Sequence, residues 1–140
     1  LFLLFESQKK LLEDLATNPS MTDSSIRRFA LAVLANRNTV ADSTNLILWE
    51  TATNDPDPNI RGAAIEHLRN HPVPPPTSRL IPILDLDPDW NVRYAIVETL
   101  AHIPSEDDAH NALNALKNAA QRDPHPKVAA KAQSILYGEQ

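Results

Sequence analysis

A short motif that opens with Asp-Pro and places an arginine six residues after the aspartate recurs along this chain. Residues 55–68 read DPDPNIRGAAIEHL, residues 87–100 read DPDWNVRYAIVETL, and an eroded copy begins at Asp123-Pro124. Sequence repeats of this length are typical of units that cannot bury an apolar face alone and must stack on one another. The recurrence therefore predicts a repeat architecture, and it leaves the identity of any ligand open.

Each copy carries an apolar stripe at helical spacing. The copies align at four positions that are 34, 32 and 36 residues apart: Ile26, Ile60, Val92 and Val128. The residues four and eight positions further on are small or apolar in every copy: Ala30, Ala64, Ile96 and Ala132, then Leu34, Leu68, Leu100 and Leu136. In the first copy Phe29 joins this apolar set. Side chains at such spacing share one face of an α-helix, so each copy is predicted to be a helix packed closely on its neighbours.

The composition favours helices over sheets. The chain has two glycines and twelve prolines, and the remainder is rich in alanine and leucine. Proline ends helices, and the run at 72–76 forces an extended connection between two copies. We therefore expect an all-α fold of eight helices in four pairs, forming one domain over 1–140 with approximate repeats at 1–36, 39–70, 77–103 and 105–137.

An arginine follows the aligned residue directly in three copies, at Arg27, Arg61 and Arg93. At 100° per residue this position falls in the middle of the apolar arc. A buried guanidinium costs several kcal/mol unless it is paired and hydrogen-bonded. The aspartate six residues earlier is the recurrent candidate partner, Asp55 for Arg61 and Asp87 for Arg93.

This pattern, an aspartate, five residues and then an arginine preceded by Val or Ile, resembles HEAT repeats of the short, phycobilisome-lyase-type variety, over residues 20–140. The resemblance implies helix pairs stacked in a right-handed α-solenoid. It also implies a hydrogen-bonded ladder between neighbouring repeats, formed here by Arg27, Asp55, Arg61, Asp87 and Arg93. Met21 replaces the first aspartate of the pattern and Ala129 the last arginine, which fits terminal repeats with a neighbour on one side only.

By the same resemblance, the second helix of each pair lines a concave surface where solenoids hold their partners. The solvent-facing positions of these helices supply the predicted partner-binding residues: Arg28, Glu66, Arg69, Tyr94, Glu98 and His102, with Trp90 at the rim. An exposed aromatic side chain is a typical interface residue. We therefore expect a non-catalytic scaffold whose partner is another protein.

An enzyme is the alternative hypothesis, because HEAT-like folds include deoxyhypusine hydroxylase, whose iron is held by His-Glu pairs, and bilin lyases of phycobilisomes. Here the pair Glu66-His67 occurs once and in reverse order. Glu66 and Glu98 would lie roughly 10 Å apart, too far to share a proton. His67 and His71 have no evident third metal ligand, and there is no cysteine. We expect no catalytic residue, no metal site and no cofactor.

A nucleic-acid-binding protein is the weaker alternative. Alkylpurine DNA glycosylases of this fold use a basic groove with exposed aromatic residues, whereas this chain has a net charge of −5. Glu66 and Glu98 would place the wrong sign of charge on the concave surface, because phosphate contacts require cations.

The apolar run Leu1 to Phe5 is predicted to be the packing face of a first helix. It is too short to span a bilayer, so we expect membrane contact only through a segment upstream of Leu1, and the absence of an initial Met suggests that Leu1 is not the native start. The sequence leaves the compartment open, with the cytoplasm as the default.

Overall fold

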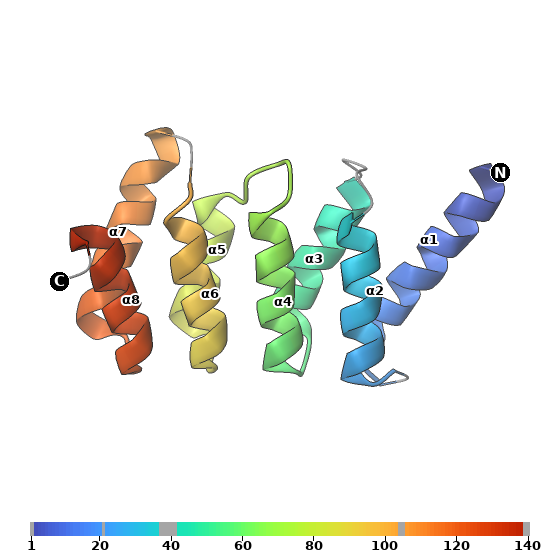
Figure 1. Ribbon diagram of the computed structural model, residues 1–140, viewed down its shortest axis with the longest axis horizontal. Coiled ribbons are helices and arrows are strands. Elements are labelled where there is room, and N and C mark those ends of the chain that lie inside the picture. Colours follow the sequence, from blue (N-terminus) through green and yellow to red (C-terminus); the bar gives the residue numbers. More distant parts are fainter. Residues whose placement is uncertain (1, 21, 37–41, 104–105, 139–140) are drawn as a thin grey trace. The chain divides into compact units, whose positions relative to one another are not determined.

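The computed structural model describes residues 2–20, 22–36, 42–103 and 106–138, and these residues form eight α-helices and no strand (Figure 1). The all-α prediction is therefore confirmed for the described chain. The helices are α1 (Phe2–Thr17), α2 (Ser24–Asn36), α3 (Asp42–Asn54), α4 (Pro58–Arg69), α5 (Thr77–Leu86), α6 (Trp90–Leu100), α7 (Glu106–Arg122) and α8 (Pro126–Tyr137). The expectations for the side chains of Leu1 to Phe5 and for Met21 fall outside what is described.

The chain forms two compact units, residues 1–73 and 74–140, each with two of the predicted repeats. In the first unit α1 packs on α2 and α3 on α4, while α1 also contacts α3 and α2 contacts α4. First helices thus form one layer and second helices the other. Leu31, Leu34, Leu48, Ile60 and Ile65 are almost completely buried between them.

The second unit repeats this arrangement. α5 packs on α6 and α7 on α8, with further contacts between α5 and α7 and between α6 and α8. The core includes Leu80, Val92, Ile96 and Val128, each with no exposed surface. Each unit is therefore a two-layer stack of helix pairs, which is the building principle of an α-solenoid.

Three second helices begin in the same way, because the residue before each one caps it. Asp57 accepts a hydrogen bond from the Asn59 backbone N–H (2.9 Å), and Asp89 accepts one from Asn91 (2.8 Å). Such caps satisfy backbone donors that have no partner within the helix. Before α8 the cap is His125, whose Nδ1 accepts from the backbone N–H two residues later at 3.3 Å.

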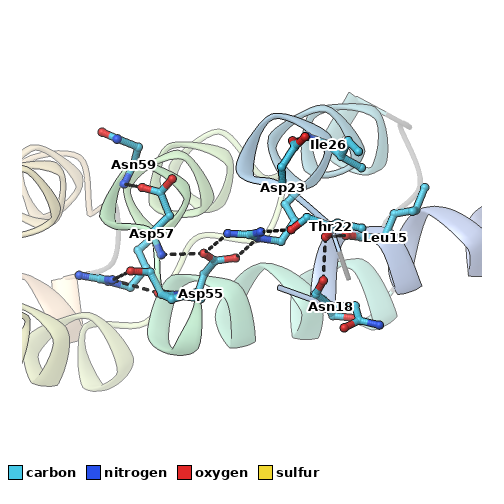
Figure 2. Close-up of polar contacts among 12 residues, drawn as sticks. Leu15, Asn18, Thr22, Asp23, Ile26, Asp55, Asp57 and Asn59 are labelled. Atoms are coloured by element: carbon cyan, nitrogen blue, oxygen red, sulfur yellow. Dashed lines mark hydrogen bonds and ion pairs between the residues drawn. The ribbon is translucent and has the colours of Figure 1, made fainter. Parts of the chain in front are cut away.

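The first aspartate of each motif joins neighbouring repeats. In the first unit, Asp55 Oδ2 and Oδ1 accept from Nε and Nη2 of Arg27 at 2.8 and 3.0 Å, and Nη1 of Arg27 donates to the Thr22 carbonyl at 2.6 Å (Figure 2). Asp55 also accepts from the Asp57 backbone N–H at 2.9 Å, which holds the turn. The side-chain hydrogen bonding to Asp55 raises the pKa of Arg27 above its ordinary value against the opposing effect of burial, so the guanidinium stays charged although it is buried.

The second unit has the same connection between Arg93 and Asp123. Nε and Nη2 of Arg93 donate to Oδ2 and Oδ1 of Asp123 at 2.9 and 3.1 Å, whereas Nη1 donates to the backbone carbonyl of Asp87 at 3.0 Å. Similarly, Nη1 of Arg61 donates to the carbonyl of Asp55 at 2.9 Å. The prediction that the aspartate six residues earlier supplies the carboxylate is therefore wrong for Arg93. That aspartate contributes its backbone carbonyl, and the carboxylate comes from the next repeat.

Two apolar residues of the first copy do not share the burial of their counterparts. Ile60, Val92 and Val128 are at most 1% exposed, but Ile26 is 42% and Phe29 is 67% exposed. The expectation that both belong to the packing face is therefore wrong. In the described part of the first unit, α2 contacts α1, α3 and α4, and these contacts leave Ile26 and Phe29 exposed.

Candidate partner-binding surface

The predicted binding residues lie on the second helices, in two groups that belong to different units. Arg28 is on α2, and Glu66 and Arg69 are on α4, with Arg28 and Glu66 exposed. The second group is formed by Trp90, Tyr94 and Glu98, which are half-buried on α6, and by the exposed His102 just after it. The imidazole of His102 is held at the helix end, with Nδ1 2.9 Å from the Glu98 carbonyl.

In the first unit, Arg28 and Glu66 both influence the protonation of His67, which directly follows Glu66 in the sequence. Burial lowers the pKa of His67 below its ordinary value; the Glu66 carboxylate opposes this shift and the Arg28 guanidinium adds to it. The imidazole of His67 is therefore neutral at neutral pH. A neutral, half-buried histidine beside charged neighbours is suited to packing and hydrogen bonding.

His71, the other member of the histidine pair, is held by the backbone. Its Nδ1 accepts from the Val73 N–H at 3.1 Å. Over the described ranges, no three His, Cys, Asp or Glu side chains come together in a group that could hold a metal ion.

The second unit carries a group of aromatic and cationic side chains, here named the Trp90 cluster: Trp90, Tyr94, His125, Lys127 and Lys131. The rings of Trp90 and His125 are stacked, with centroids 4.2 Å apart and planes 6° from parallel. Tyr94 meets Trp90 edge to face, with centroids 6.4 Å apart. The ammonium groups of Lys127 and Lys131 lie 5.2 Å from the Trp90 ring centroid and 5.8 Å from that of Tyr94, within the range of cation–π attraction.

The cluster forms because matching positions of α6 and α8 come to lie side by side. Trp90 is the first residue of α6, where α4 and α8 begin with a proline, and His125 is the residue that caps α8. α6 and α8 pack on each other, so the two helix starts place an indole against an imidazole.

Sequence reasoning identified Trp90 and Tyr94 but missed His125, Lys127 and Lys131. The available signal was positional: His125 occupies the place that Asp57 and Asp89 occupy in other copies, and Trp90 occupies that of a proline. A histidine at the capping position of one copy and a tryptophan at the next position of the preceding copy indicate a contact between these two repeats. This contact can be predicted only if the repeats are assumed to stack on one another.

Chemically, the Trp90 cluster offers aromatic surface and positive charge. The nearby carboxylates have other partners: Asp89 caps α6, and Asp123 is bound by Arg93. This arrangement can hold a ligand by stacking, apolar contact and charge.

Each unit also has a small cavity, and polar residues that line it form the hydrogen bonds between repeats. In the second unit a cavity of about 180 Å³ is lined by Arg93 and Asp123, together with Asp85 and Arg122. In the first unit a cavity of about 90 Å³ is lined by Asp55 and Glu50. Asp55 is bound by Arg27, and Asp123 is bound by Arg93. Both cavities are therefore part of the junctions between repeats.

Comparison with known proteins identifies one family. A family model described as HEAT repeats matches residues 45–136. No match was found among curated proteins or among solved structures. Within the described residues, none of the helices is both long enough and apolar enough to cross a membrane.

Proposed function

Because the chain belongs to the HEAT-repeat family, we propose that it is a non-catalytic scaffold that binds another protein through the exposed faces of its second helices. Helix pairs of this kind present one continuous row of side chains per repeat. The paired arginines and aspartates stiffen the junction between repeats, and a rigid surface loses little conformational entropy when it binds.

The observation that carries this proposal is the Trp90 cluster. Trp90 and Tyr94 are half-buried, so each keeps part of its ring accessible while neighbouring side chains fix its position. Tryptophan and tyrosine are enriched among the residues that contribute most to protein–protein binding. A preformed aromatic surface with a polar margin is what such an interface requires.

Arg28, Glu66 and Arg69 are proposed to contribute from the first unit. Arg28 and Glu66 are exposed on neighbouring second helices, so a partner that follows the second helices would meet both signs of charge. Charged residues at the margin of an interface mainly affect the association rate and the choice of partner.

The proposal can be tested by site-specific photo-crosslinking in cells that express the full chain. A photoreactive amino acid replaces Tyr94 in one variant and Leu113, an exposed residue of α7, in the other. We expect a protein adduct from position 94 that is absent from position 113, because only position 94 belongs to a second helix. The captured protein is then identified and produced for binding measurements.

Binding of that protein should fall at least about tenfold when Tyr94→Ala is combined with Glu98→Arg. The matched control combines Asn111→Ala with Lys117→Glu on exposed positions of α7. Equal binding by wild type and the α6 variant, or equal crosslinking from both positions, would contradict a binding face on the second helices.

A further inference from the structure

The two lysines of the Trp90 cluster form a positively charged pair on one face of α8. Lys127 and Lys131 are four residues apart, so their Cβ atoms are about 5–6 Å from each other on the same side of the helix. Each ammonium group lies against an aromatic ring of α6. Both lysine side chains therefore lie over aromatic rings of α6.

Among the described residues, neither ammonium group forms an ion pair with a carboxylate. Asp89 and Asp123 precede α6 and α8 in the sequence, and no ion pair joins either carboxylate to Lys127 or Lys131 in the part of the chain that the structure describes. Asp89 accepts from the Asn91 backbone N–H, and Asp123 from Arg93. Lys127 is exposed and Lys131 is half-buried, so both side chains keep solvent-exposed surface.

We propose that the Trp90 cluster binds an acidic peptide segment, with carboxylates of the segment on Lys127 and Lys131 and its backbone or apolar side chains against Trp90. This inference rests on the proposed function and specifies the partner's chemistry. Alternate residues of an extended peptide are about 6.7 Å apart on one side, close to the roughly 5–6 Å between Cβ atoms of residues four apart on a helix. Charged hydrogen bonds between ammonium and carboxylate groups are stronger than neutral ones.

A peptide fits these charges better than a nucleic acid. A phosphate backbone carries a regular series of charges and is bound by many cations along its path. Here only two lysines of α8 belong to the cluster. Glu98, one helical turn after Tyr94 on α6, carries the opposite charge, and the whole chain has a net charge of −5. This surface therefore matches a ligand with a few localised carboxylates.

The test uses the full chain and a short labelled peptide of alternating aspartate and serine, with fluorescence anisotropy at low and physiological salt. A matched peptide has asparagine in place of aspartate. We expect binding of the aspartate peptide only, weakened by salt because the attraction is electrostatic. Quenching or a spectral shift of Trp90 emission should accompany binding, since Trp49 is buried and away from solvent.

Two sets of variants locate the binding. Lys127→Gln combined with Lys131→Gln should weaken the aspartate peptide at least about tenfold, whereas Lys10→Gln combined with Lys117→Gln, which removes the same charge at exposed sites elsewhere, should not. His125→Asp tests the site without loss of the helix cap, because aspartate caps α4 and α6. It sets a carboxylate beside Lys127 and should also weaken binding.

Equal binding of the aspartate and asparagine peptides, or equal loss in both double-lysine variants, would overturn the proposal. Tighter binding of a thymidine oligonucleotide than of the aspartate peptide would assign the cluster to nucleic acid and would also overturn it. If the crosslinked partner still binds the Lys127→Gln and Lys131→Gln variant, the acidic-peptide proposal fails while the scaffold function stands.

Discussion

Arg93 and Asp123 are joined by two parallel hydrogen bonds, 2.9 and 3.1 Å long, although 30 positions separate them in the chain. The third nitrogen of the same guanidinium donates to the carbonyl of Asp87. One side chain thus joins the turn before its own helix to the turn before the next second helix. The same geometry at Arg27 and Asp55 makes this the connection between repeats in both units.

Arg93→Ala is expected to destabilise the protein by about 3 kcal/mol, because it leaves the buried Asp123 carboxylate without its partner. The Asp123 side chain is 5% exposed, so the variant leaves a mostly buried carboxylate without these two hydrogen bonds. Urea denaturation followed by circular dichroism measures the change. Lys117→Ala, at an exposed position of α7, serves as the control, and an unchanged midpoint for Arg93→Ala would disprove the role of this pair.

Asp89→Ala should cost about 1 kcal/mol, because α6 loses the side-chain acceptor for the Asn91 backbone N–H. Asn91→Ala is a close control, since it changes the neighbouring side chain and keeps the same N–H. The difference between the two variants in free energy of unfolding gives the contribution of the Asp89 cap to stability. Equal effects would mean that the Asp89 carboxylate contributes nothing to the start of α6.

Phe29→Ser should change stability by less than about 0.5 kcal/mol, because most of the ring is already in solvent. In contrast, Leu34→Ala on the same helix should cost about 2–5 kcal/mol, since Leu34 is 1% exposed and its removal leaves a cavity. Thermal or urea unfolding of the two variants checks the ranking. A large loss in Phe29→Ser would mean that this edge of α2 is covered.

Acidification should destabilise the protein through His67. Its pKa is lowered in the folded state, chiefly by burial, so below the unfolded-state pKa of about 6.5 the unfolded chain binds more protons than the folded one. The contribution of neutral His67 is complete above that pH and is lost as the pH falls toward the folded-state pKa. Urea unfolding at several pH values should show a smaller loss below pH 6.5 in His67→Gln than in wild type, and identical pH profiles would contradict this assignment.

The helices and their register could be predicted from the sequence because their signals are local. The apolar stripe through Ile60, Ala64 and Leu68 identifies α4, and Asp57 with Pro58 marks its start. Burial of the arginines followed from their place in the same stripe. The exposure of Ile26 and Phe29 could not be predicted in this way, because it depends on which helix lies beside α2.

The partners of the buried and clustered side chains were decided only by the tertiary structure. The sequence by itself determined that each arginine is buried and needs an acceptor near the turn, because periodicity places it on the packing face. It did not determine that the carboxylate for Arg93 comes from Asp123, nor that His125 stacks on Trp90. Each of these contacts joins residues of successive repeats, so it depends on how far one helix pair is offset when it packs on the next.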